Sequence, residues 1–365
     1  MVREEIFASP ALRVVRGAGD RSGPVVVTFE PYADFPSLDR AGFGAAFFAQ
    51  QGIEAFHVIP ARNDWYQDAD MPAALAAIRA AVGEGRRLAT YGSSMGGYAA
   101  YRFSGRLRAD VVLACSPQYS VDPARVPWEK RWKRAAEGLR FPFDAEPVRR
   151  EARAYLFYDP RTADRRHARL IGREMPVCHV RLPHAGHPCL PLLREMGLLA
   201  PTVEAVVRGT FDPQALEAEV RERSDRSPRY LMHKALALPR VLRGRRVRLL
   251  DRALALAPDD PWVSLTYGWV LASHRDWDKA DARFRKALAL SPDDPSLLYV
   301  YRRFLERAGR HAEALAVQEA IVRRFPEAIA HVAELDRVRA QQARKGLLKR
   351  LIAALPGRGS HTARP

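Results

Sequence analysis

Cysteine is scarce in this sequence, and long apolar runs are missing. The 365 residues include three cysteines, Cys115, Cys178 and Cys189, and no two of them form a CxxC pair. This spacing offers no disulfide framework, so we expect reduced thiols, as in a cytoplasmic protein. No apolar run approaches the roughly 18 residues that span a bilayer, and the start Met1–Pro10 lacks the apolar stretch of a signal peptide. The sequence therefore predicts a cytoplasmic protein without a transmembrane segment.

Acidic residues are outnumbered, mainly in the second half of the chain. The net charge is +17, and residues 1–220 carry 29 Lys/Arg against 26 Asp/Glu, whereas residues 221–365 carry 30 against 16. An arginine-rich composition explains this excess. A preference for an acidic partner, a polyanion or an anionic membrane surface explains it equally well. The basic stretch Arg221–Arg248 has no recognition motif and no stacking aromatic besides Tyr230, so nucleic acid is not an expected partner.

Short apolar segments rich in β-branched residues recur through the first half and predict buried strands of a parallel sheet. Helical segments stand between most of them, and this alternation predicts an α/β fold with a doubly wound, mostly parallel sheet. The expected strands are Leu12–Val15, Val25–Phe29, Ala55–Ile59, Leu88–Tyr91, Asp110–Ala114, Ala154–Tyr158 and Cys178–Leu182. The expected helices are Phe43–Gln50, Pro72–Val82, Tyr98–Phe103, Arg165–Arg173 and Pro191–Val207.

A Gly-x-Ser-x-Gly pentapeptide, Gly92-Ser-Ser-Met-Gly96, stands between an expected strand and an expected helix. Glycine has no Cβ atom, so two glycines around Ser94 let the strand and the helix pass close to each other. Such a strand-to-helix turn exposes its serine as a nucleophile. The helix N-terminus and the N–H of the following residue, Met95, favour an oxyanion there.

A serine nucleophile needs a histidine base and a carboxylate that orients the base. His184 and His187 both follow the last expected strand, and we prefer His187. Asp159 ends the strand before it, and Asp164 opens the next helix. We prefer Asp159, because a carboxylate at a strand end can reach the histidine loop, whereas Asp164 makes a natural helix cap.

Other loops at the same edge of the sheet offer further candidates. The N–H groups of Phe29 or Glu30 are expected to supply the second oxyanion donor. Four polar and aromatic residues that follow another strand suit a polar or sugar-like ligand, although they also suit a turn anchored to the core: Asn63, Trp65, Tyr66 and Gln67. The segment Val126–Phe143 predicts either a cap over the site or a surface helix whose two tryptophans pack on the sheet.

The second half is repetitive. Ala253-Leu-Ala-Leu-Ala-Pro-Asp-Asp-Pro261 returns 34 residues later, starting at Ala287, and prolines 258, 292 and 326 keep the same period. This region resembles tetratricopeptide repeats, which have this length. Five residues match the family's small, large and terminal positions: Gly268, Ala280, Phe284, Ala287 and Pro292. Arg302 stands where a small residue is usual. Such repeats form grooves for protein partners.

The first half resembles α/β-hydrolases of the serine esterase type, on the Ser94 pentapeptide, the Ala-Gly-His turn that ends at His187 and the order serine, acid, histidine. The resemblance implies ester or thioester hydrolysis through an acyl-Ser94 intermediate, with no metal and no organic cofactor. It leaves open the substrate, a small-molecule or carbohydrate-linked ester. The alternative is an inactive hydrolase-fold scaffold that acts as a protein-interaction module.

The expected domain organisation follows from these two resemblances. Residues 1–210 form the hydrolase domain, residues 211–228 a helical linker opened by Asp212 and Pro213, and residues 229–342 the repeats, an all-α solenoid. Residues 343–365 comprise a basic amphipathic helix, Ala343–Leu355, that caps the solenoid or touches a membrane, and then a disordered tail.

Overall fold

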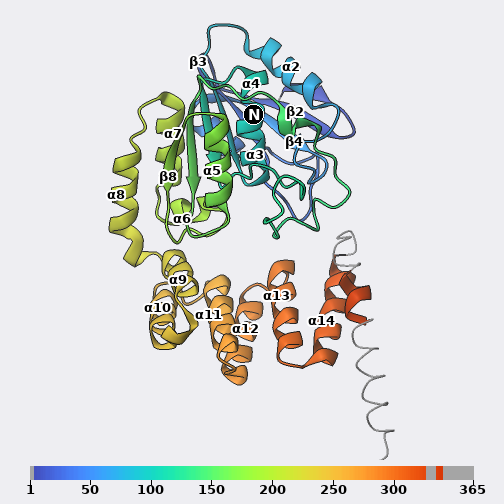
Figure 1. The fold of residues 1–365 in the computed structure, drawn as a ribbon, viewed down its shortest axis with the longest axis vertical. Helices are drawn as coiled ribbons and strands as arrows, with labels where there is room; N and C mark the ends of the chain where they lie inside the picture. Colours follow the sequence, from blue (N-terminus) through green and yellow to red (C-terminus); the bar gives the residue numbers. More distant parts are fainter. Residues whose placement is uncertain (1–3, 326–333, 340–365) are drawn as a thin grey trace, which may run out of the picture. The chain divides into compact units, whose positions relative to one another are not determined.

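The computed structural model describes residues 4–325 and 334–339, in two compact units that divide between Ala237 and Leu238 (Figure 1). The structure confirms the expected fold class, an α/β unit followed by a helical region. The expected helix Ala343–Leu355, the tail and Pro326 lie outside the described residues.

The first unit is built on one eight-stranded sheet with the order β1-β2-β4-β3-β5-β6-β7-β8. The strands β3 to β8 pair in parallel, and β2 runs antiparallel to β1 and β4. Their bounds are β1 Glu4–Ala8, β2 Leu12–Gly17, β3 Asp20–Phe29, β4 Ile53–Pro60, β5 Leu88–Ser93, β6 Val111–Cys115, β7 Arg153–Tyr158 and β8 Val177–Arg181. The seven expected strands are all present. The mostly exposed β1 was not predicted, because it carries little of the apolar pattern that marks a buried strand.

Helices cover both faces of this sheet, so alternate residues of the central strands enter two different cores. Val27 packs in one core with α3, and its neighbour Val26 packs in the other with α1 and α7. Burial on both faces explains why these strands are continuously apolar. The helix bounds are α1 Ala45–Gln50, α2 Met71–Val82, α3 Met95–Arg102, α4 Ser104–Leu107, α5 Asp164–Glu174, α6 Leu190–Glu195, α7 Leu199–Arg208, α8 Pro213–Arg223 and α9 Pro228–Ala237.

Three segments differ from the sequence-based expectation. The single helix expected over Pro191–Val207 is two helices, α6 and α7, because the chain turns at Gly197 with φ 71°. The segment Val126–Phe143 forms turns, followed by a 3₁₀ helix at Pro142–Ala145, and not the surface helix. The helices α8 and α9 belong to the first unit: Leu216 and Val220 of α8 are buried with the core beneath α7.

The second unit contains the helices α10 Arg243–Leu256, α11 Pro261–Ser273, α12 Trp277–Leu290, α13 Pro295–Arg307 and α14 His311–Arg324. Neighbouring helices pack as antiparallel hairpins. A Cβ atom at Gly268 in α11 would lie 3.1 Å from the Ala280 carbonyl oxygen of α12, so the small residue permits this close approach. Phe284 stacks on Phe304 of α13 with ring centroids 4.5 Å apart, which links one hairpin to the next.

Arg302 is buried at a position where the repeat pattern has a small residue. Its guanidinium pairs with Glu306 at 2.7 Å and with Glu334 at 2.8 Å, so the charge enters the helical core together with its counter-ions. A buried cation is tolerated when it is paired in this way.

The backbone packs very closely around the turn between β5 and α3. A Cβ atom at Gly92 would lie 2.2 Å from the carbonyl oxygen of Gly96, and one at Gly96 would lie 2.2 Å from that of Phe29 in β3. Both obstacles are backbone atoms, which cannot rotate away. Glycine is therefore required at both positions by space.

We expect Gly96→Ala to lower the free energy of unfolding by roughly 3 kcal/mol, since the methyl group forces β3 and α3 apart. Gly17→Ala is the matched control, because its new Cβ would meet its nearest neighbour, the His57 ring, at an ordinary 3.4 Å. Chemical denaturation of the two variants measures the difference, and equal stability would contradict the steric account.

Candidate functional site

Ser94 lies at the turn between β5 and α3, with backbone angles φ 55° and ψ −116°. This conformation is strained for a residue with a side chain. Two hydrogen bonds hold it: the Ser94 N–H donates to the Cys115 carbonyl at 2.8 Å, and the Ser94 carbonyl accepts from the Tyr98 N–H at 3.0 Å. The strained turn is that of a nucleophile elbow, with Ser94 next to the first residue of α3.

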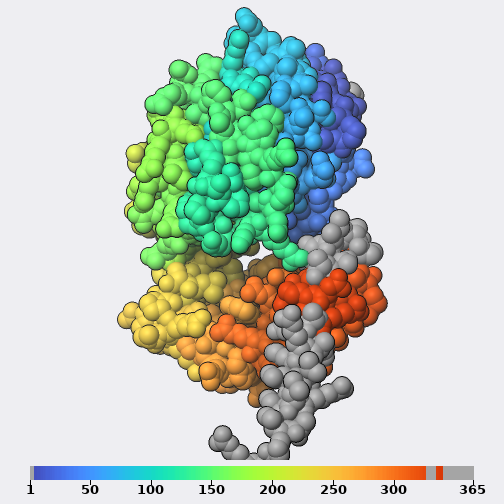
Figure 2. Space-filling model, turned by 45° about the vertical axis from the view of Figure 1, so that its right-hand side comes forward, coloured from blue at the N-terminus to red at the C-terminus, as the bar shows by residue number. Residues whose placement is uncertain are grey.

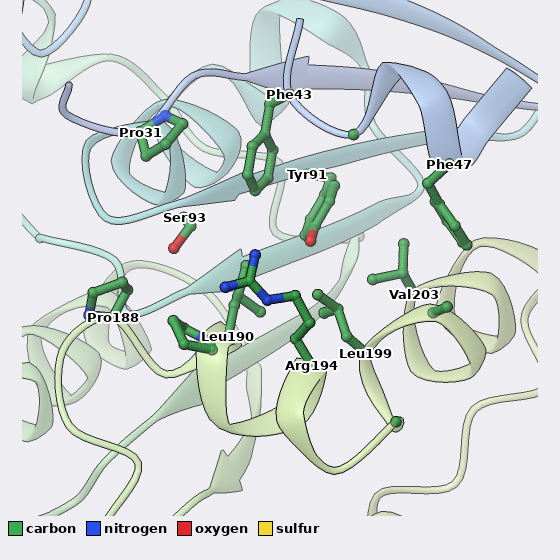
Figure 3. Close-up of a pocket in the computed structure, with 14 residues that line it drawn as sticks. Pro31, Phe43, Phe47, Tyr91, Ser93, Pro188, Leu190, Arg194, Leu199 and Val203 are labelled. Carbon is green, nitrogen blue, oxygen red and sulfur yellow. The ribbon is translucent and has the colours of Figure 1, made fainter. Parts of the chain in front are cut away.

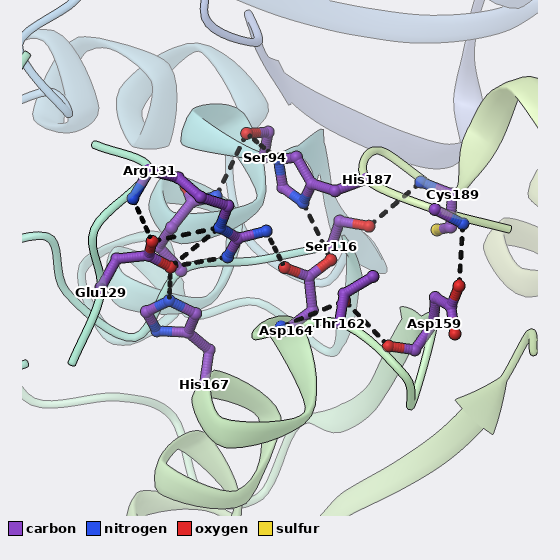
Figure 4. A network of polar contacts seen from close by, with 12 residues as sticks. Ser94, Ser116, Glu129, Arg131, Asp159, Thr162, Asp164, His167, His187 and Cys189 are labelled. Atoms are coloured by element: carbon purple, nitrogen blue, oxygen red, sulfur yellow. Dashed lines mark hydrogen bonds and ion pairs between the residues drawn. The ribbon is translucent and has the colours of Figure 1, made fainter. Parts of the chain in front are cut away.

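The side chain of Ser94 begins a chain of three hydrogen-bonded groups (Figure 4). Its Oγ lies 3.0 Å from His187 Nε2, and His187 Nδ1 lies 2.8 Å from Asp164 Oδ2. Asp164 is fully buried and Ser94 is 4% exposed. A carboxylate can only accept, so Nδ1 carries the proton and Nε2 is free to accept from the Ser94 hydroxyl. This is the tautomer that a histidine base requires.

The preferred acid, Asp159, is not the carboxylate that contacts His187. Asp159 Oδ2 accepts the Gly186 N–H at 2.9 Å and Oδ1 accepts the Arg161 N–H at 2.9 Å. It therefore shapes the loop that carries the histidine. Asp164, the alternative, is the first residue of α5 and turns its carboxylate inward to His187 instead of capping the helix.

His184, the alternative base, lies elsewhere in the same loop. Its ring packs edge-on against Tyr230, with centroids 5.1 Å apart, and its Nδ1 is buried without a hydrogen-bond partner. Burial and the nearby Arg161 lower the pKa of His184. The structure thus brings Ser94 and His187 together, as preferred from the sequence, and leaves His184 out.

Further charged groups lie around Asp164. Arg131 donates to Asp164 Oδ1 at 2.8 Å and to Glu129 Oε2 at 2.6 Å. His167 Nδ1 accepts the Tyr119 N–H at 3.0 Å, so its Nε2 carries the proton and donates to Glu129 Oε2 at 2.9 Å. Burial lowers the pKa of His167, which keeps the ring neutral.

These contacts determine the ionisation of both carboxylates. Burial acts to raise the pKa of Glu129, but hydrogen bonds from His167 and Arg131 outweigh it and hold the pKa at about 2. Burial likewise acts to raise the pKa of Asp164, and contacts with His187 and Arg131 lower it below its usual value. The surroundings of His187 therefore contain two carboxylates, one guanidinium and the neutral His167 imidazole.

Gln118, just after β6, is a further group at Ser94 that sequence reasoning missed. It is fully buried, and its Nε2 donates to Ser94 Oγ at 3.1 Å. Its Oε1 accepts from the Trp65 indole at 3.2 Å. An indole N–H can only donate, so the amide must turn its NH₂ group towards the serine. Its place beyond the carboxyl end of a parallel strand is the signal that could have found it.

The four residues predicted to bind substrate support the loops instead. Trp65 and Tyr66 are buried, and the Tyr66 hydroxyl donates to the Glu30 carbonyl at 2.9 Å. Asn63 forms two hydrogen bonds with the backbone of Ala33. Gln67 donates to the Tyr98 hydroxyl and accepts from the Phe143 N–H. Their polar groups bind the protein itself, as in the alternative interpretation of a turn anchored to the core, and their contact with a ligand stays a prediction.

The expected oxyanion donors lie around the same turn. Met95 follows Ser94 as the first residue of α3. Phe29 ends β3 and Glu30 follows it, and the Gly96 backbone packs against the carbonyl groups of both. Glu30 is buried, and burial raises the pKa of its carboxyl group although Arg40 lies 3.1 Å away. The turn at Ser94 thus lies next to Phe29 and Glu30, and their role as oxyanion donors stays a prediction.

Trp132 brings the segment Val126–Phe143 to the site. Its ring lies 5.8 Å from the His187 ring and 5.6 Å from that of Trp65. Arg131 and Glu129 come from the same segment, which lies at the surface of the first unit, coloured between teal and green in Figure 2. The segment therefore serves as a cover and as the source of the charged groups around Asp164.

The comparisons with known proteins assign the second unit. The sequence model of the tetratricopeptide repeat family matches residues 271–355. The C-terminal region contains tetratricopeptide repeats. The match begins at Leu271, near the end of α11, and covers α12, α13 and α14, so it confirms the sequence-based interpretation over that part of the chain. No curated protein matches the chain.

Solved structures resemble the chain only distantly. A capsule O-acetyltransferase of Neisseria meningitidis serogroup A is 13% identical, with a TM-score of 0.37 over 48% of this chain and 83% of that chain. A MamA double mutant from strain RS-1 is 17% identical, with a TM-score of 0.26 over 39% and 92% of the two chains. Neither an activity nor a substrate follows from likenesses at this level.

Two searches of the described residues were negative. No helix within residues 4–325 or 334–339 is long and apolar enough to cross a bilayer. In the same part of the chain, no three His, Cys, Asp or Glu side chains are grouped so that they could hold a metal ion.

The Glu129 contacts predict an acid-dependent contribution to stability. The folded pKa of about 2 lies below that of the unfolded chain, so the contribution is present at neutral pH and disappears as the pH falls from about 4.5 to about 2. Glu129→Gln should lower the free energy of unfolding at pH 7 by about 3 kcal/mol, because Arg131 and the His167 N–H lose the ionised acceptor that they share. It should also flatten the fall in stability below pH 4.5. Thermal unfolding at several pH values measures both.

Glu137→Gln is the matched control, because Glu137 is an exposed carboxylate of the same segment. It should leave the melting temperature at pH 7 nearly unchanged. An acid profile of Glu129→Gln that ran parallel to that of the wild type would contradict the assignment.

Proposed function

We propose that the first unit is a serine hydrolase that cleaves ester or thioester bonds through an acyl-Ser94 intermediate. One observation carries the proposal: Ser94 Oγ, His187 and buried Asp164 form a continuous hydrogen-bonded series, at 3.0 and 2.8 Å, on a strained strand-to-helix turn. This arrangement activates a serine that is otherwise a poor nucleophile.

The geometry supports a two-stage acyl transfer. Ser94 Oγ attacks the carbonyl carbon of the ester while its proton moves to His187 Nε2. The tetrahedral intermediate then collapses, and the leaving alcohol or thiol takes that proton. In the second stage His187 removes a proton from water, the resulting hydroxide attacks the acyl group, and Ser94 Oγ recovers its proton as the acid is released.

The charges around His187 favour the proton transfer. Asp164 and Glu129 are ionised, Arg131 is cationic and His167 is neutral, so these four groups carry one net negative charge. Protonation of His187 neutralises the cluster and removes this excess. The buried setting makes the interaction between Asp164 and the imidazolium stronger than it would be in water.

Stabilisation of the oxyanion is assigned to backbone N–H groups around the elbow. Met95 is the first donor, at the N-terminus of α3, and Phe29 or Glu30 is the second. Gln118 Nε2 lies 3.1 Å from Ser94 Oγ and supplies a further donor to charge that develops at the reacting oxygen.

The tetratricopeptide repeats support a protein partner, because such repeats present grooves for other chains. We propose that they deliver the hydrolase to that partner in the cytoplasm, and that the alcohol part of the ester is a small polar or carbohydrate-linked group. An inactive scaffold is the competing proposal, and it predicts no reactive serine.

A fluorophosphonate probe should label the wild-type chain, and Ser94→Ala should abolish the labelling. Asp164→Asn should slow labelling by about 10⁴-fold, because His187 loses its orienting carboxylate and adopts the wrong tautomer. Labelling is followed over time by mass spectrometry of the intact chain.

Asp159→Asn is the matched control, since it removes a carboxylate from the same loop that has no contact with His187. It should slow labelling far less than Asp164→Asn does. An unlabelled wild type, or full labelling of Ser94→Ala, would favour the scaffold.

Gln118→Leu should lower kcat for a short-chain aryl ester by about 10²-fold with little change in KM, because the donor acts on charge that develops in the transition state. Gln67→Leu removes an amide that has no contact with Ser94 and serves as the control for folding. A change confined to KM would contradict a role for Gln118 at the reacting oxygen.

A further inference from the structure

A cavity of about 480 Å³ lies in the first unit between the sheet and the helices α1, α6 and α7 (Figure 3). Six apolar or aromatic side chains make up much of its wall: Phe43, Phe47, Tyr91, Leu190, Leu199 and Val203. Cavities of this size and character hold small ligands of largely apolar chemistry.

One end of the cavity adjoins the catalytic residues. Three of its lining residues are chain neighbours of groups at the site: Pro31 follows Glu30, Ser93 precedes Ser94, and Pro188 follows His187. In Figure 3 these three residues lie towards one side of the view, and Phe47 and Val203 lie towards the other. Ser94 and His187 do not themselves line the cavity, so this end is where an acyl group bound to Ser94 would have to enter it.

Two polar groups interrupt the apolar lining. Ser93 is 3% exposed, and its hydroxyl has no hydrogen-bond partner among the residues that the structure describes. Arg194 of α6 is the single charged residue of the lining, and within the described part of the chain its guanidinium has no ion pair. A buried hydroxyl without a partner carries a free-energy cost that a ligand acceptor removes. A guanidinium selects a carboxylate.

We propose that this cavity binds an aliphatic carboxylic acid chain, with its carboxylate at Arg194 and Ser93 and its tail against Phe47, Leu199 and Val203. This proposal rests on the proposed serine hydrolase function. The aliphatic chain is the acyl group of the ester, and its carboxylate forms when the acyl-enzyme is hydrolysed. The acid side of the substrate is thus a medium-length alkyl chain, and the alcohol side remains free to be polar.

The test measures binding of hexanoate, octanoate and 1-octanol to the full-length chain by isothermal titration calorimetry. Each methylene that enters an apolar cavity tightens binding about 4-fold, so octanoate, with two more methylenes, should bind roughly 15-fold more tightly than hexanoate. Octanoate should also bind more tightly than 1-octanol, which has an equal tail and no charge.

Arg194→Gln should weaken octanoate about 10-fold and leave 1-octanol unchanged. Arg208→Gln removes an arginine from α7 that does not line the cavity, and it should leave the affinity for both ligands as in the wild type. Val203→Phe fills the apolar end and should weaken both ligands, and Ala200→Phe tests the same end at an exposed lining position if Val203→Phe fails to fold.

Failure of octanoate to bind, equal binding of octanoate and 1-octanol, or wild-type affinity in Arg194→Gln would each overturn the proposal. None of these measurements needs turnover. Carboxylate binding by a chain that the fluorophosphonate probe does not label would refute the hydrolase function alone. Labelling of Ser94 in a chain that does not bind octanoate would refute the acyl-chain site alone.

Discussion

The first unit depends on the way a buried carboxylate, Asp164, is kept ionised away from water. An isolated buried carboxylate would take up a proton. Arg131 on one oxygen and the His187 N–H on the other prevent this, and Glu129 in turn balances Arg131. Because Arg131 and Glu129 come from the irregular segment between β6 and β7, that segment needs no helix of its own: its ion pairs fix its path over the site.

The turn between β5 and α3 places two adjacent serines in different surroundings. Ser94 meets His187 and Gln118, whereas Ser93 lines the apolar cavity between the sheet and α1, α6 and α7. The hydrogen-bonded site and the apolar cavity are therefore joined through one peptide bond. In the proposed function, the ester bond that Ser94 cleaves and the acyl chain that the cavity binds therefore lie next to each other.

Sequence patterns predicted most of the architecture, because apolar periodicity, strand-helix alternation and the 34-residue repeat are local signals. They also brought forward Ser94 and His187. The choice between Asp159 and Asp164 could not be made from position alone, because both lie within reach of the histidine loop. The direction of the Asp164 side chain depends on Arg131, which is more than 30 residues away in the sequence. The hydrogen bond between Gln118 and Trp65 was likewise beyond reach, since it joins two loops 53 residues apart.

The spacing of Gly92 and Gly96 has a consequence for the identity of the reactive serine. Successive side chains of a strand point to opposite faces. A shift of β5 by one residue would therefore put Ser93 in the place of Ser94. Such a shift would also move Tyr91 and Met95 into the places of the glycines, where a Cβ atom has only 2.2 Å to the nearest backbone oxygen. The two serines are thus not interchangeable. Steric exclusion by the backbone fixes the register of the strand, and the hydroxyl groups do not contribute to it.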